Sequence, residues 1–345
     1  MKKNIILHIG VHKTGSTAVQ HAGELNKDWL RFNKLYWINK QHFLIPFHRL
    51  FFYRQDKTLD DLIKQQCKEQ FEKILAAITQ PTVVLSLEDL SLCYAVNQQA
   101  LQERFDAQGH YHTNRIDFLH ALGQLLQGHQ VKIILYVRRQ DLFLESLYAQ
   151  QIKSRNDYSA TFDQFIKHYP YKYIDWTQLV DQYEAQFGAG SVDVTVYERD
   201  TLLNNDILDD FYTKLGLDKL LVLPAKSAQN QRLAKDYFEK IRAFNTHIKP
   251  TAEKQHQRNQ NIVLATQLLS SQSYGFFTDQ ARIQFLQQFE QSNSQLAKKI
   301  NHSNPQLFKS PQLKSLDIID QSQHVTLSKK EIAQFKALLF KPIVC

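Results

Sequence analysis

The segment 4–17 constrains the fold more than any other part of the sequence. Its first eight residues are a mostly apolar run rich in isoleucine and valine, typical of a buried strand, and a helical pattern begins at Thr17. Gly10 and Gly15 permit tight turns between the two, and Ser16 and Thr17 are able to cap a helix whose first N–H groups bind anions. The segment therefore predicts a strand, a phosphate-binding loop and a helix in direct succession.

The rest of the first 200 residues repeats the alternation of strand and helix. Further apolar runs at 82–88, 131–137 and 192–198 predict three more strands, and helical patterns at 59–79, 116–126 and 142–152 lie between them. This order predicts an α/β fold, a central parallel sheet with helices on both faces. Beyond residue 202 the pattern is helical, at 206–216, 229–247, 257–270, 279–300 and 329–340. We expect one domain over 1–345, with an α/β nucleotide-binding core at 1–200 and a mainly helical part at 201–345 packed on it.

Composition limits the partners of the chain. The 345 residues carry a formal net charge of +8, which suits a polyanionic ligand but also simple solubility, and no long Lys/Arg run points to nucleic acid. The three cysteines, Cys67, Cys93 and Cys345, are too scattered for a disulfide framework or a structural zinc site. No signal peptide and no apolar stretch long enough for a membrane span can be identified, so we expect a cytoplasmic protein.

A lysine within the first loop distinguishes it from the loop of nucleotide triphosphatases. Gly10 and Gly15 have the spacing of a Walker motif and Thr17 falls on its hydroxyl position, but Ser16 stands where the motif has lysine. Lys13 lies three residues earlier, where its charge suits a ligand with one bridging oxygen to neutralise. An ATP-dependent phosphotransferase is therefore the less favoured alternative.

A second pattern follows the third predicted strand. Arg138 ends that strand, at the sheet edge where open α/β sheets bind ligands, and Ser146 follows eight residues later on a predicted helix. A guanidinium and a hydroxyl together can receive a phosphomonoester. The alternative for Arg138 is a surface ion pair with Asp141 or Glu145.

The two patterns together resemble the sulfotransferases that use 3′-phosphoadenosine-5′-phosphosulfate (PAPS), in particular bacterial carbohydrate sulfotransferase-like proteins. The resemblance implies a P-loop-like sulfotransferase fold in which Lys13 contacts the bridging oxygen of PAPS. It also implies that Arg138 and Ser146 bind the 3′-phosphate, and Arg139 stands where many relatives carry Asp. The other expected donor contacts are Gly10, His12, Thr14, Gly15, Ser16 and Thr17. Weaker matches to the same family are 86–90, 196–200, 211–217, 228–233 and 289–293.

The acceptor hydroxyl needs a general base, and three residues are candidates. Glu88 ends the second predicted strand, whereas His42 and His48 lie in an aromatic stretch from which relatives supply a base. We favour His48 slightly, and expect His12 to orient phosphate. The expected reaction transfers a sulfuryl group to a carbohydrate or glycolipid, leaves adenosine 3′,5′-bisphosphate (PAP) and requires no metal. A non-catalytic nucleotide-binding protein, which would keep the loop but lack a base, is the second alternative.

Overall fold

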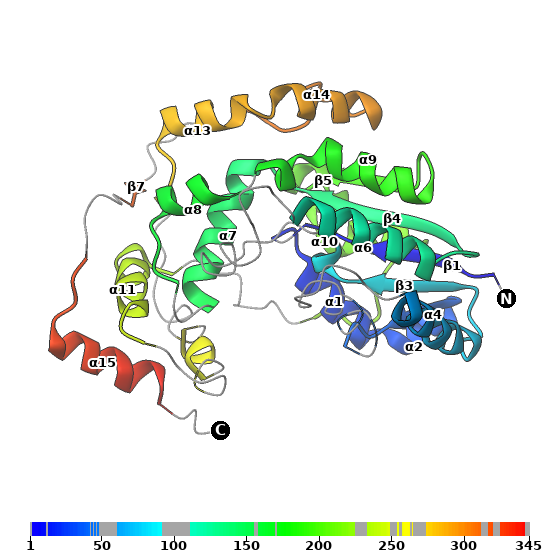
Figure 1. Cartoon of the computed structure of the whole chain (residues 1–345), viewed down its shortest axis with the longest axis horizontal. Coiled ribbons are helices and arrows are strands. Elements are labelled where there is room, and N and C mark those ends of the chain that lie inside the picture. Colours follow the sequence, from blue (N-terminus) through cyan, green and yellow to red (C-terminus); the bar gives the residue numbers. More distant parts are fainter. Residues whose placement is uncertain are drawn as a thin grey trace. The chain divides into compact units, whose positions relative to one another are not determined.

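The computed structural model describes most of the chain and divides it into two compact units. The first comprises Met1–Arg139, Tyr171–Ala225 and Phe289–Lys309, and the second comprises Gln140–Pro170, Lys226–Gln288 and Ser310–Cys345. Figure 1 shows the elements of both units, coloured along the sequence. The described residues are 2–11, 13–41, 43, 45, 47, 61–91, 111–154, 158–169, 171–224, 233–248, 254, 257–262, 264, 274–311, 317–319 and 325–341.

A five-stranded parallel sheet forms the centre of the first unit, in the order β2-β3-β1-β4-β5. The strands are β1 (Asn4–His8), β2 (Leu35–Ile38), β3 (Thr82–Ser86), β4 (Gln130–Val137) and β5 (Val192–Val196). The predicted α/β class is thus confirmed. Two strands that follow β1 in the sequence, β3 and β4, lie on its two sides. The strand order therefore reverses at β1, and sheets of this type bind ligands at the carboxyl end of the strand where this happens.

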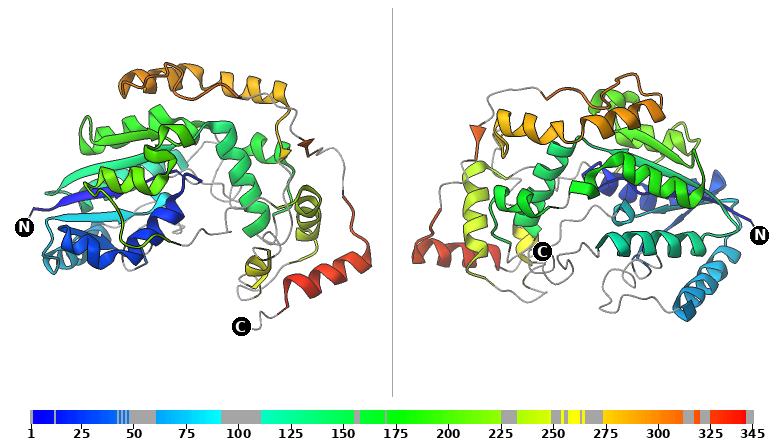
Figure 2. Two further views of the ribbon diagram at one scale, coloured as in Figure 1. Left: turned by 180° about the vertical axis from the view of Figure 1, so that it is seen from behind. Right: turned by 45° about the horizontal axis from the view of Figure 1, so that its top comes forward.

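Helices cover both faces of this sheet, as Figures 1 and 2 show. On one face α1 (Ser16–Leu25), α2 (Lys27–Phe32) and α10 (Ile207–Lys214) pack on strand residues such as Trp37 and Tyr136. On the other, α4 (Asp61–Ala76) packs against α6 (Tyr111–Leu125), and α6 packs against α9 (Trp176–Phe187). The short 3-10 helices of this unit are η1 (Glu88–Ser91), η2 (Tyr171–Ile174), η3 (Arg199–Thr201) and η4 (Leu203–Asn205).

A late helix, α14 (Glu290–Lys299), completes the first unit by packing on α9. The contact is polar at its edges: the Lys299 ammonium lies 2.5 Å from Asp181 Oδ1 and 2.6 Å from Glu184 Oε2. The Thr177 hydroxyl donates to the Ser292 carbonyl at 2.6 Å. Two stretches beyond position 200, 201–225 and 289–309, are therefore part of the same unit as the sheet.

The second unit is mainly helical and is built on an aromatic cluster. Tyr148 contacts the rings of Phe162, Phe238 and Phe276, at 4.9–5.7 Å between ring centroids. The buried Arg282 guanidinium pairs with Asp141 and with Glu145. The elements of this unit are α7 (Gln140–Ser154), α8 (Phe162–His168), α11 (Lys235–Asn245), β6 (Tyr274–Gly275), α13 (Asp279–Gln287), β7 (Asp317–Ile318) and α15 (Lys329–Leu339).

Several details differ from the sequence-based expectations. Strand β2 was not predicted, because four residues with an aromatic pair carry no clear period. The helix expected over 279–300 is two helices, α13 and α14, divided at Gln288 and Phe289. The short parallel pair of β6 and β7 was not predicted; it lies between expected helices, in the part of the chain expected to be mainly helical. Within the described residues, no helix is long and apolar enough to cross a membrane.

Candidate functional site

The loop after β1 has the backbone geometry of an anion-binding turn. Lys13 has φ 72° and Gly15 has φ 81°, so two residues in the left-handed region flank Thr14. The buried Thr14 hydroxyl donates to the Val11 carbonyl at 2.6 Å, which closes the turn. Gly15 is the N-cap of α1, so neither Ser16 nor Thr17 is the cap. Because Gly15 has no side chain to occupy them, the first N–H groups of α1 remain for a ligand.

Gly15 is favoured by close packing as well as by backbone conformation. A Cβ atom at this position would lie 3.1 Å from Ile207 Cγ1, at the start of α10, and 3.3 Å from the Tyr197 hydroxyl. L-residues with side chains rarely adopt its φ. The loop, the start of α10 and the end of β5 therefore meet at this glycine.

His8 lies beneath the loop as a buried neutral imidazole. It ends β1, its Nδ1 lies 2.8 Å from Ser86 Oγ, and its Nε2 has no hydrogen-bond partner among the described residues. Burial lowers the pKa of His8 to about 4, although the charge of Glu88 acts in the opposite direction. A Cβ on Gly10 would lie only 2.8 Å from Nε2, so the glycine lets the loop pass close to the imidazole.

A cation and a phenol lie on the β4–β5 side of the loop. The Arg138 guanidinium, just after β4, donates from Nη1 to the Lys13 carbonyl at 3.0 Å, and the Trp176 indole donates to the Arg138 carbonyl at 2.9 Å. Tyr197 follows β5. Burial raises the pKa of the Tyr197 phenol, and the positive charge of Arg138 partly offsets this. Arg138 thus supports the loop backbone and adds positive charge beside it.

A polar cluster lies on the β2–β3 side. Glu88 Oε2 accepts a hydrogen bond from Gln20 Nε2 at 2.5 Å, and the Lys40 ammonium lies 3.8 Å from the same oxygen. Lys40 also donates to Gln20 Oε1 at 2.7 Å. Glu88 is close enough to His8 to influence its pKa, so the cluster lies near the loop.

The structure brings most of the predicted donor residues together in the first unit. Gly10, Lys13 and Thr14–Thr17 form one loop and helix start, and Arg138 contacts that loop. Ser146 is on α7 in the second unit, so its pairing with Arg138 in one phosphate site stays a prediction. The carboxylates of Asp141 and Glu145, considered above as partners of Arg138, bind Arg282.

Some predicted residues lie outside the described part of the chain. His12, His42 and His48 belong to this group, as does the stretch 228–232. Glu88 is therefore the candidate base whose surroundings are defined. Sequence reasoning missed His8, Gln20 and Lys40, and the polar residue that interrupts the apolar run at His8 was the one visible signal among these three. Tyr197 lies in the weaker match over 196–200, but no role was predicted for it.

The described residues hold no group of three or more His, Cys, Asp or Glu placed to bind a metal ion.

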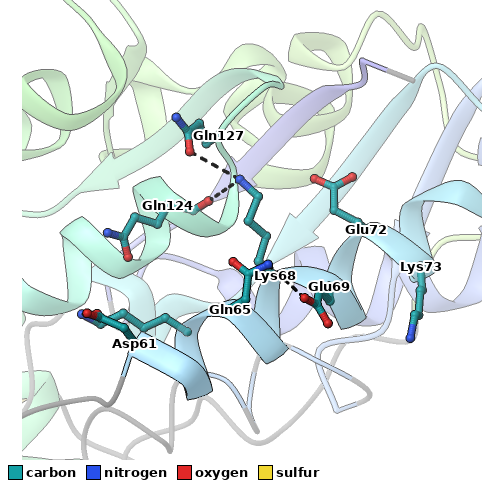
Figure 3. A pocket seen from close by; sticks show the side chains of 9 residues that line it. Asp61, Gln65, Lys68, Glu69, Glu72, Lys73, Gln124 and Gln127 are labelled. Carbon is teal, nitrogen blue, oxygen red and sulfur yellow. Dashed lines mark hydrogen bonds and ion pairs between the residues drawn. The ribbon is translucent and has the colours of Figure 1, made fainter.

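An open cavity of about 700 Å³ lies between α4 and the end of α6 (Figure 3). The acidic and basic side chains that line this cavity are equal in number, so it carries no net charge. The Lys68 ammonium donates to the Gln124 carbonyl at 3.1 Å. Gln124 and Gln127 precede β4, so this cavity lies at the amino ends of the strands, whereas the loop lies at their carboxyl ends. The cavity is lined by Asp61, Lys64, Gln65, Lys68, Glu69, Glu72, Lys73, Gln124 and Gln127.

Comparisons with known proteins give distant similarities. No protein-family model matches the chain. An uncharacterized protein of Archaeoglobus fulgidus is 28% identical over 165 residues, which are 48% of this chain and 44% of that protein. The chain thus matches less than half the length of this curated relative. The crystal structure of a sulfotransferase from Alicyclobacillus acidocaldarius has a TM-score of 0.43 and 10% identity, and the match covers 88% of this chain and 98% of that one.

Proposed function

We propose that this chain is a sulfotransferase that moves the sulfuryl group of PAPS to a hydroxyl of a carbohydrate or glycolipid. The observation that carries the proposal is Lys13 in the left-handed region, inside the turn that the Thr14 hydroxyl closes on Val11 and just before the amino end of α1. This arrangement offers backbone N–H groups and one full charge to a phosphosulfate. We also propose a cytoplasmic, reducing setting, on the scattered cysteines.

The proposed chemistry needs charge neutralisation and positioning more than covalent help. Lys13 would neutralise the charge that develops on the bridging oxygen as the sulfuryl group leaves, and the amides from Gly15 to Thr17 would hold the 5′-phosphate. Gly10, His12 and Thr14 complete the proposed loop contacts, and Arg138 and Ser146 are proposed for the 3′-phosphate. Because these groups supply the positive charge, the reaction is proposed to proceed without metal, with PAP as its product.

Three residues remain proposed for the base that removes the acceptor proton: Glu88, His48 and His42. Glu88 has structural support. Gln20 and Lys40 both contact its Oε2, while Oε1 accepts no hydrogen bond from a described residue. A carboxylate held by one oxygen keeps the other for a substrate proton.

A binding comparison tests the proposal against the phosphotransferase alternative. PAP without magnesium should stabilise the protein, by about 2.7 kcal/mol at a hundred times its Kd, and ATP with magnesium should stabilise it less. The measurement is thermal unfolding with each nucleotide, with Lys13→Gly as the variant that should lose the response to PAP. Stronger stabilisation by magnesium ATP would favour the phosphotransferase. PAP binding with no transfer of labelled sulfuryl to any of a panel of glycosides would favour a non-catalytic nucleotide-binding protein.

A further inference from the structure

Three elements bring the polar cluster of Gln20, Lys40 and Glu88 to one edge of the sheet. β2 and β3 are neighbouring parallel strands with Ile38 opposite Leu85, so the residues that follow them come close together. Lys40 is two residues past the end of β2 and Glu88 is two residues past the end of β3. Gln20 is on α1, one helical turn after Ser16.

The contacts in this cluster form a closed ring. Gln20 donates from Nε2 to Glu88 and accepts at Oε1 from Lys40, while the Lys40 ammonium also faces Glu88 Oε2. One amide thus uses both its donor and its acceptor, which fixes its orientation. Both contacts to the Glu88 carboxylate are to Oε2, and Oε1 accepts no hydrogen bond from the described residues.

We infer that Lys40 and Gln20 are positioning residues that hold Glu88 by one oxygen, so that its other oxygen receives the proton of the attacking hydroxyl. The inference rests on the proposed function. In the step, the acceptor oxygen bonds to sulfur and its proton passes to Glu88 Oε1. The bond from sulfur to the bridging oxygen breaks, and its electron pair stays on the 5′-phosphate of PAP.

This arrangement places donor binding and proton removal from the acceptor on opposite sides of one loop. Arg138 and Tyr197 lie on the β4–β5 side, where they add positive charge and a hydroxyl to the donor site. The ring of Gln20, Lys40 and Glu88 lies on the β2–β3 side. The acceptor hydroxyl therefore approaches from the β2–β3 side. The Glu88 side chain is 18% exposed and that of Lys40 is 28% exposed, so a substrate can reach the ring.

The test measures release of labelled sulfuryl from PAPS, with water and a panel of p-nitrophenyl glycosides as acceptors. Lys40→Met should lower kcat about tenfold or more, Lys40→Arg should recover most of that loss, and PAP affinity should change less than about twofold in both. The double variant Lys40→Met/Glu88→Gln should be no slower than Glu88→Gln alone, because Lys40 acts through Glu88. Lys214→Met is the matched control, since Lys214 binds Asp193 Oδ1 at 2.8 Å and is 21% exposed, and it should keep full turnover.

Each outcome distinguishes this inference from the proposed function. A wild-type protein that does not bind PAP contradicts the proposed function. If it binds PAP and transfers sulfuryl, but Lys40→Met keeps wild-type kcat, the inference is wrong and the function stands. Equal losses from Lys40→Met with and without Glu88→Gln also overturn the inference, because independent effects multiply. Binding of PAP without turnover to any acceptor, water included, contradicts the proposed function, and the inference that rests on it falls with it.

Discussion

His8 shows how one buried side chain couples the candidate site to pH. Its pKa is lowered to about 4 in the folded protein because burial disfavours the imidazolium, whereas an unfolded chain takes up this proton near the ordinary value of 6.5. Between pH 6.5 and about pH 4 the protein therefore takes up a proton at His8 when it unfolds. The free energy of unfolding falls as the pH drops through this range. Between pH 7 and pH 4.5 the wild-type protein should lose about 2–3 kcal/mol more than His8→Asn. Urea unfolding at both pH values measures this, and equal losses would show that His8 does not carry the effect.

Substitutions at Lys13 distinguish the effect of its charge on catalysis from its effect on the stability of the loop. Because its φ of 72° disfavours a side chain, Lys13→Gly should leave the free energy of unfolding within about 1 kcal/mol of wild type. The same change removes the charge at the transferred group and should raise the barrier by roughly 2.7–4 kcal/mol, as for other preorganised donors. Lys13→Ala should lose the same turnover but retain the backbone strain. Wild-type turnover in either variant would remove this loop from the donor site.

At the scale of elements, Gly15 joins the loop to α10 and β5. Gly216 is the matched control, because its φ of 80° is nearly that of Gly15 and nothing lies within 4 Å of the position a Cβ would take. Gly216→Ala should cost about 1–2 kcal/mol for backbone conformation alone. Gly15→Ala should cost about 1–3 kcal/mol more, because the methyl group meets Ile207 and Tyr197, and PAP binding should be lost only in this variant. Equal unfolding free energies for the two variants would contradict this account of the packing.

The sequence predicted those elements whose pattern is local. The continuous apolar run of β4 and Gly15 of the first loop can be recognised in the sequence, because burial on both faces and positive φ each demand particular residue types. The strand β2 and the ring of Gln20, Lys40 and Glu88 could not be identified in this way. They depend on the order β2-β3-β1, which sets residues far apart in sequence side by side, and no single segment carries that order.

Across the whole molecule, the proposed donor site draws on residues that belong to different units of the chain. Ser146→Ala should weaken PAP binding by about 1.5–3 kcal/mol, roughly ten- to a hundredfold, and leave AMP binding unchanged, because AMP has no 3′-phosphate. Arg138→Ala should also weaken PAP binding more than AMP binding. It should weaken AMP binding somewhat as well, because it removes the hydrogen bond to the Lys13 carbonyl. Calorimetric titration of both nucleotides measures the difference. Equal losses for PAP and AMP in Ser146→Ala would remove this residue from the 3′-phosphate site.

The packing of α14 on α9 has a consequence for the protein while it is being made. All five strands have been synthesised once Val196 is added, but α14 ends only at Lys299, roughly a hundred residues later. At about 5–20 residues per second, the ribosome leaves the outer side of α9 uncovered for about 5–20 s. That side presents the carboxylates of Asp181 and Glu184, which later bind Lys299. The nascent chain thus waits for α14 with these two carboxylates exposed, and exposed charge of this kind opposes association with other unfinished chains.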